Sequence, residues 1–274
     1  MPSLSDHKSL QYRKLLLLGD AKVGKTTSLV SLVKAGFRIG ILDMDNLLDS
    51  FVAFCRRDCP TLLDNVDVRT LRDKMKMTPS GPLLDGPAKA FPDAIKMIDK
   101  WKYDEVDWGV PGNWGQDHIL VLDSLSRFCD AAYDWAEMLT PKGKSGQYDA
   151  RAVYGSAQDA VEKVLATITS PNFETNVIVI CHGQYMELED GKTKIFPQGV
   201  GQKLSPKIPQ YFPAYVRYTN DNGKRRIQLK STPLIDLANP DPFTITEDSL
   251  DVSDLSKLFG KVSTASNIKP LKRA

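Results

Sequence analysis

The feature that most constrains the fold of this chain is a glycine-bounded loop that lies between four leucines and a helical pattern. Residues 15–27 read Leu-Leu-Leu-Leu-Gly-Asp-Ala-Lys-Val-Gly-Lys-Thr-Thr. The loop fits the pattern G-x-x-x-x-G-K-[ST], in which glycines let successive backbone N–H groups face one anion. A helix that begins near Lys25 adds the partial positive charge of its first turn. The stretch therefore predicts a buried strand, a phosphate-binding loop and a helix.

The chemistry of this loop assigns roles to two of its side chains. Lys25 is expected to reach the β- and γ-phosphates of a nucleotide, and the Thr26 hydroxyl is expected to ligate Mg²⁺. ATP and Mg²⁺ are therefore the expected cofactors. A chance match is the alternative, but the preceding leucines and the helical spacing that follows are the context that supports the motif. The residues expected to contact the nucleotide are Gly19, Asp20, Ala21, Lys22, Val23, Gly24, Lys25, Thr26 and Thr27.

Composition allows a packed core and gives no global signal for nucleic acid. The chain has 274 residues, of which 42% are hydrophobic and 26% charged, enough for one large α/β domain with tails. The formal net charge is +2, so any contact with DNA must come from local clusters. The polar start of the chain and the lack of an apolar run near ~20 residues predict a protein with no signal peptide and no membrane contact. The four cysteines are expected to be free, buried thiols.

Two acids follow the second apolar segment, residues 39–45. Strand, helix and strand within about 30 residues predict a βαβ unit and a parallel sheet. Ligands of such sheets lie at the carboxyl ends of the strands, where Asp43 and Asp45 are expected beside the phosphate loop. At least one of them could polarise the water that attacks the γ-phosphate. The alternative is that both only cap the helix that follows.

Two further apolar runs end in polar side chains that suit nucleotide chemistry. Residues 118–124 have the form of a Walker B strand, and Asp123 at its end is expected to support Mg²⁺ opposite Thr26. The alternative is an ordinary core strand whose Asp caps the next helix. Residues 176–182 end in His182, which could hydrogen-bond the γ-phosphate and report its presence. A loop histidine without a role is the alternative.

The remaining patterns complete an α/β fold. We expect a mostly parallel twisted sheet flanked by helices, with an antiparallel hairpin at one edge, formed by residues 215–230. The expected units are a flexible arm (1–13), a core (14–240) and a basic tail (241–274). The other expected elements are helices at 47–57, 91–101, 124–139 and 154–168, a strand at 66–71, loops at 78–87, 108–115 and 140–146, a charged turn at 187–194, and a flexible, then helical segment at 199–209.

The order of these landmarks resembles a RecA-type ATPase core. By that resemblance Asp45 takes the position of the catalytic base, although the family has the longer Glu there. Asp123 followed by Ser124 matches the Walker B strand, and His182 stands where the family has a glutamine that senses γ-phosphate. Residues 199–204 resemble the second DNA-binding loop, and residues 142–146 lie in or near the first. Lys230 lies on a strand similar to one that contacts ATP across a subunit interface.

A closer resemblance is to compact phage RecA-like proteins, the single-strand annealing and recombination ATPases of the Sak group. It rests on residues 69–71, His182, 204–209 and 232–236 together with the phosphate loop. It implies an ATPase that binds single-stranded DNA and promotes annealing or exchange, working as a filament or ring in the host cytoplasm. A single-stranded-DNA-binding protein is a possible partner. The lysines expected to contact DNA phosphates are Lys142, Lys144, Lys192, Lys194, Lys203 and Lys207.

Two other functions fit the same residues. A helicase-like motor would share the core and translocate on DNA. A nucleotide-switch adaptor would bind a partner protein instead of DNA.

Overall fold

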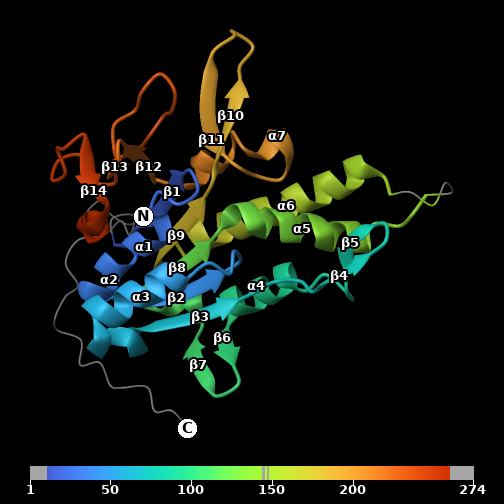
Figure 1. The fold of residues 1–274 in the computed structure, drawn as a ribbon, viewed down its shortest axis with the longest axis horizontal. Coiled ribbons are helices and arrows are strands. Elements are labelled where there is room, and N and C mark those ends of the chain that lie inside the picture. The colour runs from blue at the N-terminus through green and yellow to red at the C-terminus, as the bar shows by residue number, and fades with distance from the viewer. Residues whose placement is uncertain (1–10, 144–145, 147, 260–274) are drawn as a thin grey trace, which may run out of the picture.

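The centre of the fold is an eight-stranded sheet, seen in a computed structural model that describes residues 11–143, 146 and 148–259 (Figure 1). The strands are ordered β14-β13-β12-β1-β9-β8-β2-β3. Their bounds are β1 Lys14–Gly19, β2 Arg38–Asp43, β3 Val66–Thr70, β8 Gly115–Asp123, β9 Thr175–Cys181, β12 Ala214–Asp221, β13 Lys224–Gln228 and β14 Ser249–Asp251.

Strand β1 lies in the interior of this sheet and carries the leucine run. It pairs in parallel with β9 on one side and with β12 on the other. Leu15, Leu16, Leu17 and Leu18 are at most 1% exposed, as expected for a parallel strand covered on both faces. The parallel part of the sheet runs from β12 to β3, and β13 and β14 continue it in antiparallel pairing. The predicted α/β fold with an antiparallel edge hairpin is confirmed.

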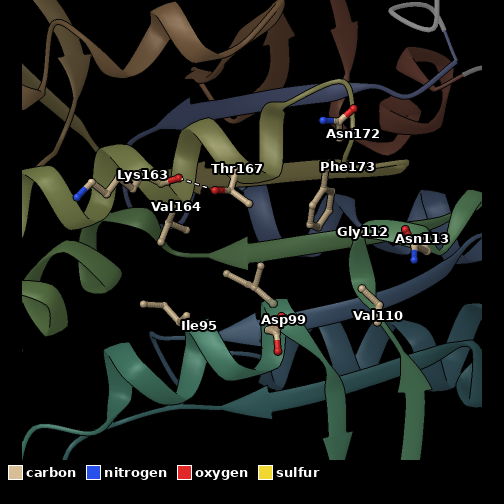
Figure 2. Close-up of a pocket in the computed structure, with 11 residues that line it drawn as sticks. Ile95, Asp99, Val110, Gly112, Asn113, Lys163, Val164, Thr167, Asn172 and Phe173 are labelled. Atoms are coloured by element: carbon tan, nitrogen blue, oxygen red, sulfur yellow. Dashed lines mark hydrogen bonds between the residues drawn. The ribbon is translucent and has the colours of Figure 1, made fainter.

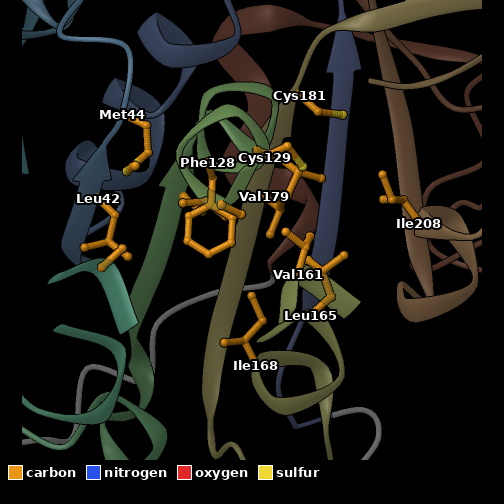
Figure 3. Packing of buried hydrophobic residues seen from close by; sticks show 14 of the residues in the cluster. Leu42, Met44, Phe128, Cys129, Val161, Leu165, Ile168, Val179, Cys181 and Ile208 are labelled. Carbon is orange, nitrogen blue, oxygen red and sulfur yellow. The ribbon is translucent and has the colours of Figure 1, made fainter. Parts of the chain in front are cut away.

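Alternate side chains of β1 enter two separate cores, one on each face. Leu16 and Leu18 pack with apolar residues of α4, α5 and α6, and Figure 3 shows Phe128 of α5 and Val161 of α6 within this cluster. Leu15 and Leu17 pack with Leu29 and with apolar residues of α2 and α3. The helix bounds are α1 Lys25–Ser28, α2 Val30–Lys34, α3 Asp49–Asp58, α4 Ala90–Asp99, α5 Leu125–Leu139, α6 Ala150–Thr169 and α7 Gly201–Leu204.

Short hairpins and 3-10 turns fill the connections. The segment at 78–87, expected to be a loop, is instead largely part of a hairpin, because the extended residues 75–78 pair with residues 81–84 across a turn. The β10–β11 hairpin projects away from the sheet in Figure 1. The bounds are β4 Met75–Thr78, β5 Gly81–Leu84, β6 Trp101–Tyr103, β7 Val106–Gly109, β10 Gly183–Glu187, β11 Thr193–Pro197, η3 Pro60–Asn65, η4 Pro111–Asn113, η5 Ile208–Tyr211 and η6 Val252–Leu258.

The core does not end at residue 240 as the sequence suggested. Strand β14 adds an edge to the sheet through β13, and η6 packs against α1 and α2. Leu255 is fully buried and Leu258 is 1% exposed. The sequence does not indicate this packing, because these apolar residues are spaced among acids and serines and their shared burial is visible only once β13 is placed. The expected arm at 1–10 and the basic residues after Phe259 lie outside the described residues.

Replacing Leu255 with alanine should therefore destabilise the whole domain. The change leaves a cavity in the core that η6 shares with α1 and α2, and we expect the free energy of unfolding to fall by about 2–5 kcal/mol. Urea denaturation measures this. Phe243→Ala is the matched control, because Phe243 is 94% exposed and its loss should cost no more than ~0.5 kcal/mol. Equal effects of the two substitutions would show that residues 249–258 do not belong to the core.

A buried lysine lies at the amino end of β1. Lys14 is 5% exposed, and its Nζ donates to the carbonyls of Phe173 and Thr175 at 2.6 Å each. Burial lowers the pKa of Lys14 from 10.5 to about 7. Between these two pH values the unfolded chain keeps the proton on Lys14 that the folded chain releases. Burial of Lys14 therefore lowers the free energy of unfolding most below pH 7 and least near pH 10.

The free energy of unfolding should accordingly rise with pH between about 7 and 10 because of Lys14. The slope due to this one group approaches about 1.4 kcal/mol per pH unit. Urea denaturation at pH 7, 8 and 9 measures it, with Lys14→Met as the reference that has no proton to release. Parallel pH profiles for the two proteins would contradict a strongly lowered pKa at this position.

Candidate functional site

The phosphate loop leaves β1 at Gly19 and enters α1 at Lys25, as the motif predicts. Lys22 and Gly24 have φ of 64° and 101°, so the backbone turns through the left-handed region twice. A Cβ on Gly19 would lie 2.9 Å from both Cβ and the carbonyl oxygen of Tyr218 on β12. Glycine is required at the start of the loop because the neighbouring strand approaches so closely.

Lys25 lies inside the loop and is 6% exposed. Its Nζ donates to the carbonyl oxygens of Gly19 and Asp20 at 2.7 Å each. Burial lowers the pKa of Lys25, and nearby acidic groups such as Asp123 act in the opposite direction. The ammonium is therefore held within the loop and close to the carboxylates of the site.

Thr26 follows β1 and Asp123 ends β8, and the two side chains are in contact although strand β9 lies between β1 and β8. The Thr26 hydroxyl donates to Asp123 Oδ2 at 2.6 Å. Asp123 is 3% exposed, and burial raises its pKa to about 6, helped by the charges of Asp45 and Asp43 and opposed by the Thr26 hydrogen bond. A buried carboxylate beside a hydroxyl offers the hard oxygen donors that Mg²⁺ prefers. The residues present fit this cation.

The structure gives different surroundings to the two acids, Asp43 at the end of β2 and Asp45 just after it. Asp43 accepts from the backbone N of Asn46 at 2.7 Å and from the Thr70 hydroxyl at 2.9 Å. Asn46 has φ of 56°, so Asp43 holds the turn after the strand. Its two oxygens are occupied by these structural bonds, whereas Asp45 faces the other chemical groups of the site.

Asp45 is surrounded by groups that stabilise its ionised form. Ser124 Oγ donates to its Oδ1 at 3.1 Å, His182 Nε2 lies 3.9 Å from its Oδ2, and Arg127 Nε lies 3.9 Å from its Oδ1. Burial raises the pKa of Asp45, but the interactions with His182, Ser124 and Arg127 outweigh burial and leave it below the usual value. Asp45 is thus an oriented carboxylate that can accept a hydrogen bond or a proton from water.

His182 follows β9 directly and connects the site to a projecting segment. Its backbone N donates to Ser126 Oγ at 3.1 Å, and its carbonyl accepts from the backbone N of Gln198 at 2.9 Å. Strand β10 begins at the next residue, Gly183. A displacement of His182 would therefore be transmitted to both strands of the β10–β11 hairpin.

Sequence reasoning missed several residues that support this site. Arg72 donates to the carbonyl of Asp45 at 3.0 Å, and Ser126 is buried against the backbone of His182. Arg127, in the helix that follows the Walker B strand, lies near Asp45 and was not among the predicted site residues. Since α5 begins directly after Ser124, its first turn must lie at the carboxyl edge of the sheet, and that position could have identified Ser126 and Arg127.

Most lysines that were expected to contact DNA have partners within the chain. Lys203 is exposed, and Lys144 lies outside the described residues. Three of the partnered lysines form ion pairs, Lys192–Asp190 at 2.8 Å, Lys194–Asp236 at 2.6 Å and Lys207–Glu162 at 2.8 Å. The Lys142 ammonium lies 5.0 Å from the centre of the Tyr148 ring. Lys230, which was expected to contact ATP across a subunit interface, pairs with Asp248 at 3.4 Å.

Two other features lie away from the phosphate loop. The tryptophans of residues 108–115 pack on Trp101 and His118. A cavity of about 420 Å³ lies between α4 and α6, and Figure 2 shows Ile95 and Val164 on its walls. Gly112 and Phe173, which also line it, come just before β8 and β9, so this cavity is at the amino end of the sheet and separate from the phosphate loop.

The described part of the chain has neither a membrane-spanning helix nor a cluster of metal-ligating side chains. No helix there is long and apolar enough to cross a membrane. No group of three or more His, Cys, Asp or Glu side chains there could hold a metal ion. The proposed Mg²⁺ donors therefore form a sparse set of one carboxylate and one hydroxyl, as in sites where phosphates and water complete the coordination.

Comparison with known proteins identifies the family. A model of the family AAA_24, described as an AAA domain, matches residues 11–237. This match covers most of the chain, so the chain belongs to that family. No curated protein matches the chain. Among solved structures, an ATP synthase subunit, NeqB, from Nanoarcheaum equitans aligns with 9% identity and a TM-score of 0.38 over 77% of this chain. The chain spans about half of that structure, 48% of its length.

Proposed function

We propose that this member of the AAA-domain family hydrolyses ATP with Mg²⁺ and uses the hydrolysis cycle to control binding of single-stranded DNA. The observation that carries the ATPase proposal is the convergence of the phosphate loop, Asp123, Asp45 and His182 at one edge of the sheet. These groups come from the ends of β1, β8, β2 and β9, which are neighbours in the parallel sheet.

The loop would bind the phosphates and the metal. Lys25 would exchange its two carbonyl acceptors for β- and γ-phosphate oxygens, a charge-assisted contact within a buried site. Thr26 and Asp123 would hold Mg²⁺. A cation held there would supply positive charge that offsets the negative charge of the phosphates.

Asp45 would orient the water that attacks the γ-phosphate. Its side chain is one methylene shorter than the glutamate of the RecA-type core that the sequence resembles. Ser124 fixes one carboxylate oxygen at 3.1 Å, and His182 lies near the other, so the orientation of Asp45 is set by two different strands. This arrangement supports a role for Asp45 as the base.

His182 would couple the γ-phosphate to the rest of the molecule. The imidazole lies near Asp45, and the backbone of the same residue bonds Gln198 at the end of the β10–β11 hairpin. Loss of the γ-phosphate would change the position of the imidazole and, through this backbone, the segment 183–211.

Single-stranded DNA is the partner we propose for that segment, with annealing or strand exchange in phage recombination as the process. Support comes from the resemblance to the Sak group and from the exposed Lys203 in α7. Contacts by Lys142, Lys144, Lys192, Lys194 and Lys207 would be to phosphates and sensitive to salt. A ring or filament of this chain would bring Lys230 near a neighbour's nucleotide, and a single-stranded-DNA-binding protein would be a further partner.

A nucleotide-controlled adaptor for a partner protein is a second candidate. The observation in its favour is that Lys192, Lys194 and Lys207 are already paired with carboxylates, which reduces the positive potential of the surface. Tyr185 on β10 is 55% exposed and could serve a protein interface.

Replacing Asp45 with asparagine should separate catalysis from nucleotide binding. We expect kcat for ATP hydrolysis to fall about 10²–10⁴-fold, since the amide keeps the shape but cannot accept the proton. The Kd for ATP should change by less than about threefold. Asp159→Asn, on the exposed side of α6, is the control and should keep full activity. An Asp45→Asn protein with normal kcat would exclude Asp45 as the base.

DNA binding should depend on nucleotide if the coupling is correct. Fluorescence anisotropy with a labelled oligonucleotide, in the presence of ATP, ADP or no nucleotide, measures this. We expect the ATP-bound form to bind at least about tenfold more tightly, with affinity falling as salt rises. Lys25→Ala should abolish the difference between nucleotides.

The outcome also decides between the candidates. No binding under any nucleotide condition would reject the DNA proposal and favour the adaptor. Sustained displacement of a strand from a duplex would instead indicate a helicase-like motor. Affinity that is indifferent to both nucleotide and Lys25→Ala would refute the coupling through His182.

A further inference from the structure

An exposed arginine of strand β13 lies on the face of the sheet that carries the phosphate-loop helix. Tyr218 of β12 pairs with Ile227, and Asn220 pairs with Arg225. Side chains two residues apart on a strand share a face, so Arg225 and Ile227 point the same way. Ile227 is fully buried in the core that also contains Leu29, just after α1. Arg225 therefore extends this face beyond the core, toward the phosphate loop.

The side chain of Arg225 reaches the last glycine of that loop. A Cβ on Gly24 would lie 3.6 Å from Arg225 Cδ and 3.7 Å from its Nη1. The guanidinium is thus in van der Waals range of the residue before Lys25. No ion pair of Arg225 with a carboxylate occurs among the residues described here. The neighbouring Arg226 points to the opposite face, where it lines a pocket with Arg217 and Gln228.

The order of strands specifies which part of a nucleotide Arg225 would meet. Strand β1 has β9 on one side and β12 on the other. Asp123, Asp45 and His182 all lie on the β9 side, where the γ-phosphate and the attacking water belong in the proposed reaction. Arg225 lies on the β12 side of the loop. It would therefore contact the phosphates that ATP and ADP share.

We propose that Arg225 is a nucleotide-binding residue, supplied by the same chain as the phosphate loop, whose guanidinium contacts α- or β-phosphate oxygens. The inference rests on the proposed nucleotide site and names one more of its contacts. A guanidinium presents a fork of N–H donors that matches phosphate oxygens, and it stays charged at all relevant pH values. A Cβ on Gly24 would make only ordinary contact with this side chain, and glycine is favoured at this position because its backbone has φ of 101°.

Isothermal titration calorimetry with ATP and with ADP tests this contact in the full chain. Arg225→Ala should weaken both nucleotides by about tenfold, the lower end of what a charged hydrogen bond contributes. Arg226→Ala, the adjacent arginine on the other face, should bind both nucleotides like the wild type. The affinities for ATP and ADP should fall by the same factor, because both nucleotides carry the α- and β-phosphates.

Each result has a defined meaning. Equal affinities of wild type and Arg225→Ala would overturn the inference. Weakening of ATP alone would overturn the assignment to the shared phosphates. If the wild type bound neither nucleotide, the proposed nucleotide site itself would fail, which is a distinct result. Thermal unfolding without nucleotide should match between Arg225→Ala and Arg226→Ala, so a folding defect can be recognised.

Discussion

The parallel pairing of β1 with its neighbours is the constraint on which the site depends. Parallel strands place all their carboxyl ends at one edge, so polar residues that are up to about 160 positions apart in the chain meet there. The hydrogen bond between Thr26 and Asp123, across β9, is the direct expression of this geometry. Had β1 been an antiparallel strand, the loop and Asp123 would lie at opposite ends of the sheet.

This geometry also creates an electrostatic problem that explains the surrounding residues. Asp43, Asp45 and Asp123 follow or end adjacent strands, and their mutual repulsion contributes to the raised pKa of Asp123. Two of the three have local partners: Asn46 and Thr70 bind Asp43, while Ser124, His182 and Arg127 surround Asp45. Asp123 has the Thr26 hydroxyl and the more distant Lys25. The carboxylate that is least compensated is therefore the one placed to receive a cation.

The sequence predicted those parts of the fold that depend on local pattern. A run such as Leu15–Leu18 indicates a strand buried on both faces, and a glycine-bounded loop before a helix has few alternatives. Sequence alone left open which of Asp43 and Asp45 faces the site, because both follow the same strand and the answer depends on Thr70 of β3. It also missed Arg225, whose neighbour is Gly24 of the phosphate loop, and Leu255, whose helix packs on α1 and α2, because tertiary packing alone brings these residues together.

The lysines of the projecting segment show why charge in a sequence is a weak guide to a binding surface. Each of Lys192, Lys194 and Lys207 is counted as basic in a linear reading, yet each lies within 3 Å of a carboxylate. Such exposed pairs contribute little to stability, so a phosphate could replace the carboxylate at small cost. What the pairs remove is the long-range potential that attracts DNA before contact. A DNA-binding role would then depend on movement of the segment 183–211, and the His182 backbone is the connection through which nucleotide could cause it.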